Sequence, residues 1–271
     1  MNLETLYTLI SNFLIVLEHK EDKKAQMSDS EVILAYILAF YAHGGNYSKA
    51  LWSLSQNKDI TYVLSRSRFS RRLKRLKSII RQIFYLMSEM SKQNCSVFQI
   101  DSFPVKICHN IRISRCRLVE GEEYRGKNQS KREYFYGFKV HILTAENGHV
   151  VELQIVAGEA HDSKAFDLFE FDLHEKSEIY ADSAYTAYYF EDILKEAFDI
   201  DFLPVRKINS KHPDNKQYNN YLRQHKRHIV ETFISMIKGL YPNKVHATNL
   251  KGFIFKIFGF IFTHNFYILL N

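Results

Sequence analysis

The stretch VFQID, residues 97–101, begins the strand-rich part of the chain and is an apolar run that ends in a carboxylate. A second run of this kind, IYAD, occupies residues 179–182. Short apolar runs are typical of buried strands, and a carboxylate that ends such a strand lies at the rim of the sheet. We therefore expect Asp101 and Asp182 to lie at one rim of a sheet.

A third acid, Glu231, ends the stretch RHIVE, residues 227–231, in a basic region that is expected to be helical. Two strand ends and one helix can bring three carboxylates together. Such a cluster suits two divalent cations about 4 Å apart, the geometry of in-line phosphoryl transfer. Each acid also has an ordinary alternative role: Asp101 as the start of a turn, Asp182 as a helix cap, and Glu231 as the partner of Arg227.

The pattern from residue 97 onward predicts a mixed sheet with helices on its faces, in the order β-β-β-α-β-α-β-α. The expected strands cover residues 97–101, 134–143, 149–156, 178–182 and 202–205, and the expected helices cover 163–173, 185–198 and 218–240. Asn147-Gly148 indicates a hairpin between the second and third strands. The polar and basic stretch 109–132 is expected to be an insertion loop.

Residues 1–94 are expected to form a separate all-α region ahead of a catalytic domain over 95–271. They carry 14 Lys and Arg against 8 Asp and Glu, so +6 of the net charge of +7 lies there. Apolar residues spaced by three and four predict a helix over 67–90. A basic face without acids runs beside them from residue 66 to 81, and it contains Arg66, Arg68, Arg71, Arg72, Lys74, Arg75, Lys77 and Arg81.

That basic face favours contact with a DNA backbone, because eight cations without an acid would repel one another in isolation. The alternative is an ordinary solvated helix face. The pI near 9.1 agrees with a polyanionic partner, although it is shared by other classes of basic protein.

The composition of the 271 residues, 46% hydrophobic and 25% charged, is typical of a globular protein. Three cysteines without a CxxC pair argue against a disulfide framework and a structural zinc site, and favour a reducing cytoplasm. Residues 1–16 lack the features of a signal peptide. The apolar stretch 252–270 is interrupted by Lys256, His264 and Asn265, so we expect a buried helix there and no membrane association.

Five segments together resemble the DDE transposases of bacterial insertion sequences, over roughly residues 97–270. They are FQIDS (98–102), YGFKVH (136–141), GEAHDS (158–163), YADSAY (180–185) and RHIVE (227–231). The intervals of 81 residues from Asp101 to Asp182 and 49 residues from Asp182 to Glu231 also agree with that family. The resemblance implies an RNase H-like core in which these three acids are catalytic and bind two Mg²⁺ ions, with Mn²⁺ as a substitute.

In many relatives the glutamate helix also carries Tyr, Arg and Lys at fixed intervals. Arg227 and Lys238 match the Arg and Lys positions, whereas Gln224 stands at the Tyr position. The resemblance implies that Arg227 and Lys238 hold DNA phosphates near the metals. His161 is a further candidate for phosphate contact, and the alternative for its segment is that Asp162 or Ser163 caps the next helix.

The function implied is that of a bacterial DNA transposase, cytoplasmic and nucleoid-associated, which binds terminal inverted repeats and target DNA as a homo-oligomer. Two alternatives stay open. An RNase H-like nuclease or resolvase would use the same carboxylates, and an inactive remnant would bind DNA without cleaving it.

Overall fold

The computed structural model describes residues 2–128, 132–206, 232–242 and 245–270. The chain forms two compact units. The first combines Met1–Met87 with Ile237–Ala247 and Lys251–Asn271, and the second consists of Ser88–Met236 with Thr248–Leu250. This division differs from the expected 1–94 and 95–271, because the C-terminal segment belongs to the unit of the N-terminal helices.

The first unit is helical. Its helices are α1 (Leu3–Val16), α2 (Asp29–His43), α3 (Tyr47–Ser55), α4 (Arg66–Arg75), most of α5 (Lys77–Asn94) and most of α9 (Leu250–Leu269). A capping box begins α2, in which the Ser28 side chain accepts the Glu31 N–H and the Glu31 carboxylate accepts the Ser28 N–H. The helix expected over 67–90 is instead two helices, α4 and α5, separated at Leu76.

Helix α9 packs into the core of the first unit. The Tyr36 hydroxyl of α2 donates to the Phe255 carbonyl at 2.9 Å, and the rings of Phe40 and Phe260 lie 4.7 Å apart. Among the described residues α9 is the one helix long and apolar enough to cross a membrane, and 61% of its apolar window is buried. The expected burial of this C-terminal helix is therefore confirmed.

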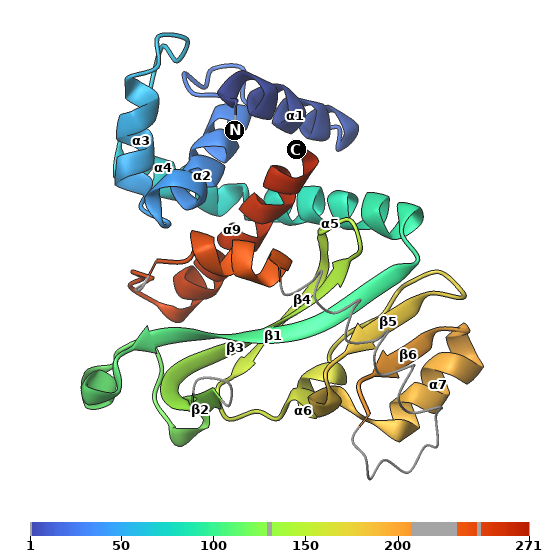
Figure 1. Ribbon diagram of the computed structural model, residues 1–271. Coiled ribbons are helices and arrows are strands. Elements are labelled where there is room, and N and C mark those ends of the chain that lie inside the picture. Colours follow the sequence, from blue (N-terminus) through green and yellow to red (C-terminus); the bar gives the residue numbers. More distant parts are fainter. Residues whose placement is uncertain (1, 129–131, 207–231, 243–244, 271) are drawn as a thin grey trace. The chain divides into compact units, whose positions relative to one another are not determined.

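The second unit holds a six-stranded mixed sheet (Figure 1). Its strands are β1 (Val97–Cys108), β2 (Arg125–Asn128), β3 (Glu133–Ala145), β4 (Val150–Ala157), β5 (Glu178–Ala181) and β6 (Asp201–Pro204). The strand order is β2-β3-β1-β5-β6, with β4 also paired to β3. The β1–β3 and β3–β4 pairs are antiparallel, whereas β5 is parallel to both β1 and β6. This arrangement confirms the expected α/β class and fits an RNase H-like fold.

Two strand predictions need correction. Strand β1 continues past Asp101 to Cys108, so this aspartate lies inside the strand. The stretch expected to be a loop over 109–132 contains two short 3₁₀ helices, η1 (Asn110–Arg115) and η2 (Glu122–Tyr124), and the strand β2. The predicted hairpin after β3 is confirmed, because Gly148 adopts φ 91° in the turn to β4.

Two helix predictions also change. Helix α6 (Asp162–Phe166) is shorter than the expected 163–173. The expected helix over 185–198 begins later, as α7 (Tyr188–Phe198), after the 3₁₀ turn η3 (Ser183–Tyr185). For the helix expected over 218–240, the described part covers residues 232–240 and is helical.

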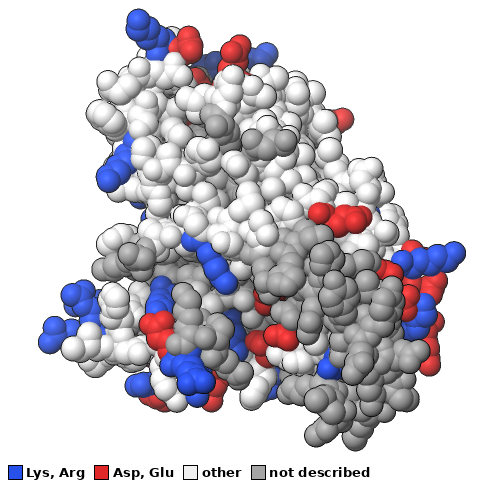
Figure 2. All heavy atoms as spheres, in the orientation of Figure 1, with Lys and Arg blue, Asp and Glu red and all other residues white. Residues whose placement is uncertain are grey.

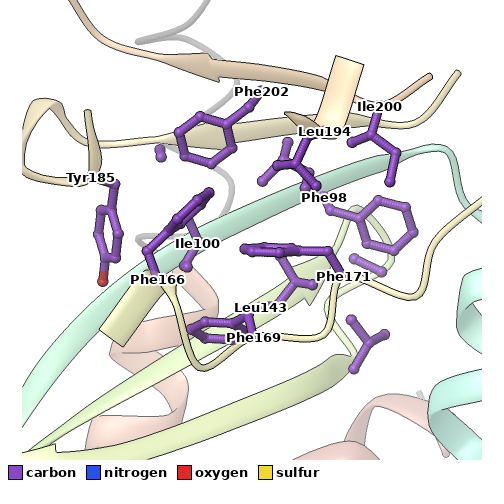
Figure 3. Packing of buried hydrophobic residues seen from close by; sticks show 14 of the residues in the cluster. Phe98, Ile100, Leu143, Phe166, Phe169, Phe171, Tyr185, Leu194, Ile200 and Phe202 are labelled. Carbon is purple, nitrogen blue, oxygen red and sulfur yellow. The ribbon is translucent and has the colours of Figure 1, made fainter. Parts of the chain in front are cut away.

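The core of the second unit lies on one face of the sheet, under α6, α7 and the segment that follows α6. Figure 3 shows Phe166 of α6 among rings from the segment after α6 and from β6, with Leu194 of α7 close by. The ring centroid of Phe166 lies 4.7 Å from that of Phe202 and 4.8 Å from that of Phe171. Aromatic contacts at these distances add to the burial energy and hold α6 on the sheet.

Candidate active site

Asp101 and Asp182 lie at neighbouring positions of two adjacent parallel strands. The β1–β5 pairing ends with Ile100 opposite Ala181, and each aspartate is the next residue along the chain. Adjacent strands lie about 4.8 Å apart. The two aspartates therefore start from neighbouring backbone positions at the end of the ladder, although 81 residues separate them in sequence.

The two aspartates share the face of the sheet opposite the hydrophobic cluster. Ile100 and Ala181 belong to that cluster, and successive residues of an extended chain point to opposite faces. Asp101 continues β1, and Asp182 has an extended backbone with φ −74° and ψ 160°. Both residues are half-buried, and in both the Oδ1 atom accepts the backbone N–H of the serine that follows, at 2.7 and 2.6 Å respectively.

Of the ordinary alternative roles of the two aspartates, the one for Asp182 is confirmed and the one for Asp101 is wrong. Asp182 is the N-cap of η3, so its expected capping role is confirmed, although on a 3₁₀ turn. Asp101 does not start a turn, because β1 continues through it. A carboxylate in mid-strand beside a second carboxylate has no capping role to explain it, which strengthens the case for a joint site.

A tyrosine and a histidine lie close to the aspartates on the core side of the sheet. The Tyr185 hydroxyl and the His141 Nδ1 atom form a hydrogen bond of 2.6 Å. His141 stands on β3 directly opposite Ser102 of β1, and the Ser102 side chain lies within hydrogen-bonding reach of the same phenol. Tyr185 ends η3 and so follows Asp182 by three residues. The tyrosine thus reaches from the segment of one aspartate to the strand that pairs with the other.

A lysine–aspartate pair lies beside this histidine. Lys139 is two residues before His141 on β3, so the two side chains share a face. The Lys139 ammonium donates to Asp162 Oδ1 at 3.2 Å and to the Ala160 carbonyl at 2.8 Å. Asp162 Oδ1 also lies 3.9 Å from His141 Nε2, a buried atom that has no hydrogen-bond partner among the described residues.

Burial sets the charge state of the histidine and the tyrosine. Burial lowers the pKa of His141 to about 4, against the smaller opposing effect of the Asp162 carboxylate. The imidazole is therefore neutral at neutral pH. Burial also raises the pKa of the Tyr185 phenol, and the nearby carboxylates of Asp162, Asp101 and Asp182 raise it further. The phenol is therefore protonated and available for hydrogen bonding.

Carboxylate oxygens are the ligands that Mg²⁺ and Mn²⁺ prefer. Two half-buried aspartates that start side by side would repel one another, and a cation between them would relieve that repulsion. The residues present therefore fit a divalent metal ion. Among the described residues no three His, Cys, Asp or Glu side chains gather in one place.

Four of the predicted site residues remain to be placed. Glu231 and Arg227 lie outside the described residues. Lys238 is exposed and belongs to the first unit, whereas the two aspartates belong to the second. His161 is exposed and is the N-cap of α6 without a side-chain capping bond. The alternative in which Asp162 caps α6 is wrong, because Asp162 is the first residue of that helix and pairs with Lys139.

Six of the eight residues of the basic face lie on α4, and Lys77 and Arg81 lie on α5. Five of the six on α4 are exposed, namely Arg66, Arg68, Arg71, Lys74 and Arg75. Arg72 instead donates through Nε to Oδ1 of the buried Asp29 at 2.9 Å, and Asp29 Oδ2 lies 2.8 Å from His19 Nε2. Arg72 is thus an anchor of α4 on α2, and its charge is already compensated.

The exposed arginines surround a hollow. Arg68, Arg71, Arg72 and Arg75 line it together with Leu64, and its volume is about 190 Å³. The face of the first unit in view in Figure 2 carries few charged side chains. A row of guanidinium groups around a concavity suits an anionic backbone.

Sequence reasoning named Asp162 only as a cap and gave no role to Lys139, His141 or Tyr185. A signal was present for Lys139 and His141, because they are polar residues at alternate positions of a mostly apolar strand. That pattern places both on one face. Tyr185 carried no such signal, since a tyrosine three residues after an aspartate is common in ordinary turns.

The comparisons with known proteins agree with this geometry. A family model described as a transposase DDE domain matches residues 90–248, which is more than half of the chain. A search among curated proteins finds no match, and a search among solved structures finds none either. The matched residues include both aspartates, the β3 segment with His141, and Tyr185. The chain therefore belongs to the transposase DDE domain family, a family of nucleotidyl-transfer enzymes that act on DNA and generally use divalent metal ions.

Proposed function

We propose that this transposase binds the terminal inverted repeats of an insertion sequence and catalyses metal-dependent DNA strand cleavage and strand transfer. The observation that carries the proposal is the register of β1 and β5, which brings Asp101 and Asp182 to adjacent positions on one face of the sheet. Glu231 completes the acidic set in this proposal. DNA-bound homo-oligomers in a bacterial cytoplasm are part of the same proposal.

The described residues supply the parts of such a reaction as follows. Asp101 and Asp182 would hold Mg²⁺, or Mn²⁺ in its place, which when bound supplies Lewis-acid activation of a water or 3′-hydroxyl and of the scissile phosphate. The backbone N–H groups that donate to each Oδ1 atom orient the two carboxylates before metal arrives. Arg227, Lys238 and His161 are proposed to hold DNA phosphates near the acids.

The first unit is proposed to bind the DNA ends through the exposed residues of α4. Guanidinium and ammonium groups that neutralise phosphates release counterions, so this binding must weaken steeply with salt. Arg72 is left out of the contact set, because its guanidinium is bound to the buried Asp29.

The direct test uses a labelled terminal inverted repeat with Mg²⁺ and the full-length chain. Asp101→Ala, Asp182→Ala and Glu231→Ala should each abolish cleavage while binding of the repeat persists. Full cleavage by any one variant would remove that residue from the mechanism.

The same assay separates the alternatives. A nuclease or resolvase of this fold would release cut ends and never join them to a target duplex. An inactive remnant would bind the repeat and give no Mg²⁺-dependent cleavage. Joined products that depend on all three acids would exclude both.

A further inference from the structure

We propose that Tyr185 and His141 are positioning residues that hold Asp182 in register with Asp101 and so build the divalent-metal site before the metal binds. This inference rests on the proposed function of the two aspartates. It assigns a role to two buried side chains that touch neither DNA nor metal in the proposed mechanism.

The need for such a device follows from where the strand pairing ends. The last register pair between β1 and β5 is Ile100 with Ala181, one residue before each aspartate. Beyond it the chain leaves β5 and turns into η3 at residue 183. The pairing of β5 therefore orients Asp182 from its N-terminal side, and a tie of the η3 turn to the sheet would orient it from the other side.

Tyr185 supplies that tie from the other side. Its hydroxyl forms the 2.6 Å hydrogen bond to His141 Nδ1, and His141 is held opposite Ser102 by the β1–β3 pairing. The path from Asp182 through Tyr185, His141 and Ser102 thus returns to the residue next to Asp101. The segment of one aspartate is thereby fastened to the strands that carry the other.

Both partners are too well enclosed to shift. Tyr185 is 1% exposed and belongs to the hydrophobic cluster, where Figure 3 shows its ring beside Phe166. His141 is fully buried, and the ring centroids of the two residues lie 5.8 Å apart in an edge-on arrangement. A hydrogen bond between two such side chains fixes direction as well as distance.

The test measures metal binding directly, by the loss of the free Mn²⁺ signal in electron paramagnetic resonance, with the full-length chain and no DNA. Tyr185→Phe keeps the ring and removes the hydroxyl, and we expect Mn²⁺ affinity to fall about 10- to 100-fold, the usual effect of losing a group that orients a ligand. The Mg²⁺ concentration for half-maximal cleavage should rise by a similar factor, while the Kd for the terminal repeat stays unchanged.

Two further variants keep the test decisive. Tyr185→Phe/His141→Leu removes both polar partners together and so avoids an unpaired buried nitrogen, and it should show the same loss of Mn²⁺ affinity in a folded protein. Tyr136→Phe is the matched control, because it removes a buried hydroxyl of β3 that donates to the Gly121 carbonyl. That variant should bind Mn²⁺ like the wild type.

The outcomes distinguish this inference from the proposed function beneath it. If Asp101→Asn weakens Mn²⁺ binding and Tyr185→Phe leaves it within threefold of wild type, the site stands and the positioning role is overturned. If Asp101→Asn itself leaves Mn²⁺ binding intact, the metal site is overturned and the positioning role with it.

Discussion

Asp101 and Asp182 occupy the first positions beyond the last pair of the β1–β5 ladder, Ile100 opposite Ala181, so two strands place their acids side by side. The ladder is parallel, which means both chains run toward the same rim of the sheet. One acid lies within a continuing strand and the other at the start of a turn. Strand pairing therefore holds Asp101 on both sides along the chain, whereas the position of Asp182 also depends on the contacts of the turn that follows it.

Because the two acids are proposed to act as one unit, their substitutions should not add. We expect Asp101→Ala and Asp182→Ala each to lower the rate of strand cleavage by at least about 10³-fold, and the double variant to be no slower than the worse single variant. Single-turnover cleavage of a labelled repeat measures this. If the rate loss of the double variant were instead the product of the two single losses, the two carboxylates would act independently.

Arg72 and its neighbour Arg71 should differ in their effect on the stability of the protein. Arg72→Ala leaves the buried Asp29 without its arginine and should lower the free energy of unfolding by about 3 kcal/mol. Arg71→Ala changes an exposed residue and should stay within about 0.5 kcal/mol of wild type. Urea denaturation checks both, and equal stability of the two variants would rule out the anchoring role of Arg72.

The exposed arginines of α4 should determine how DNA binding depends on salt. Replacing Arg68, Arg71 and Arg75 together by Gln should make the slope of log K against log salt concentration shallower by about 2.7, if each contacts one phosphate. Fluorescence anisotropy with the terminal repeat from 50 to about 200 mM salt measures the slope.

The control for this series is Lys195→Gln. Lys195 is exposed on α7 and already pairs with Asp199 at 2.8 Å and Asp201 at 3.1 Å, so its loss should leave the slope unchanged. A slope that is also unchanged in the triple arginine variant would show that α4 presents an ordinary solvated face.

His141 should make stability depend on pH in a defined window. Burial lowers its pKa from 6.5 to about 4, so between these values the unfolded chain binds a proton that the folded chain does not. Stability from this group is complete above pH 6.5 and falls as the pH drops toward 4, by about 3 kcal/mol.

Unfolding of the wild type and of Tyr185→Phe/His141→Leu at pH 7.0 and 4.5 (about the ends of this window) isolates the effect. The double variant lacks the imidazole and should lose less stability on acidification. Asp162 and Lys139, which face the imidazole in the wild type, are present in both proteins, so their own contributions are largely retained in the comparison.

Two glycines in the C-terminal part of the first unit should respond in opposite ways to alanine. A Cβ atom at Gly259 of α9 would lie 2.3 Å from the Phe40 ring and 2.6 Å from the Tyr36 hydroxyl, so Gly259→Ala should cost about 1–3 kcal/mol of stability. A Cβ atom at Gly239 meets no heavy atom within 4 Å among the described residues, and Gly239→Ala should stabilise by about 0.5 kcal/mol. Thermal unfolding distinguishes them, and a loss at both positions would refute the packing argument.

Much of the sheet could be predicted because most of its strands contain apolar runs. The start of β5 and the turn at Gly148 follow from local chemistry alone. The length of β1 could not be predicted in this way, because Pro104 lacks the backbone N–H that a central strand needs. The structure tolerates it since β5 pairs with β1 only as far as Ile100, and past that point the described strand has an edge on this side.

The ends of the helices were harder to predict. The helical spacing of apolar residues continues through Leu76, so no local pattern indicates that α4 and α5 are separate helices. After Phe166 the chain leaves the helix to place Phe169 and Phe171 in the core, the latter with a positive φ of 48°. Tertiary packing overrode the helical spacing there. The contact of Tyr185 with His141 depends on strand pairing across 44 residues, which no local pattern encodes.

The position of α9 has a consequence for the order in which this protein becomes complete. The helices made first by the ribosome share a core with a helix made more than 160 residues later, after the whole catalytic sheet. In the unit proposed to bind DNA, Tyr36 and Phe40 gain these partners only when α9 has been made. Long-range closure of this kind is slow. A chain that stopped before α9 would thus lack part of the core of the unit proposed to bind DNA, even with Asp101 and Asp182 in place.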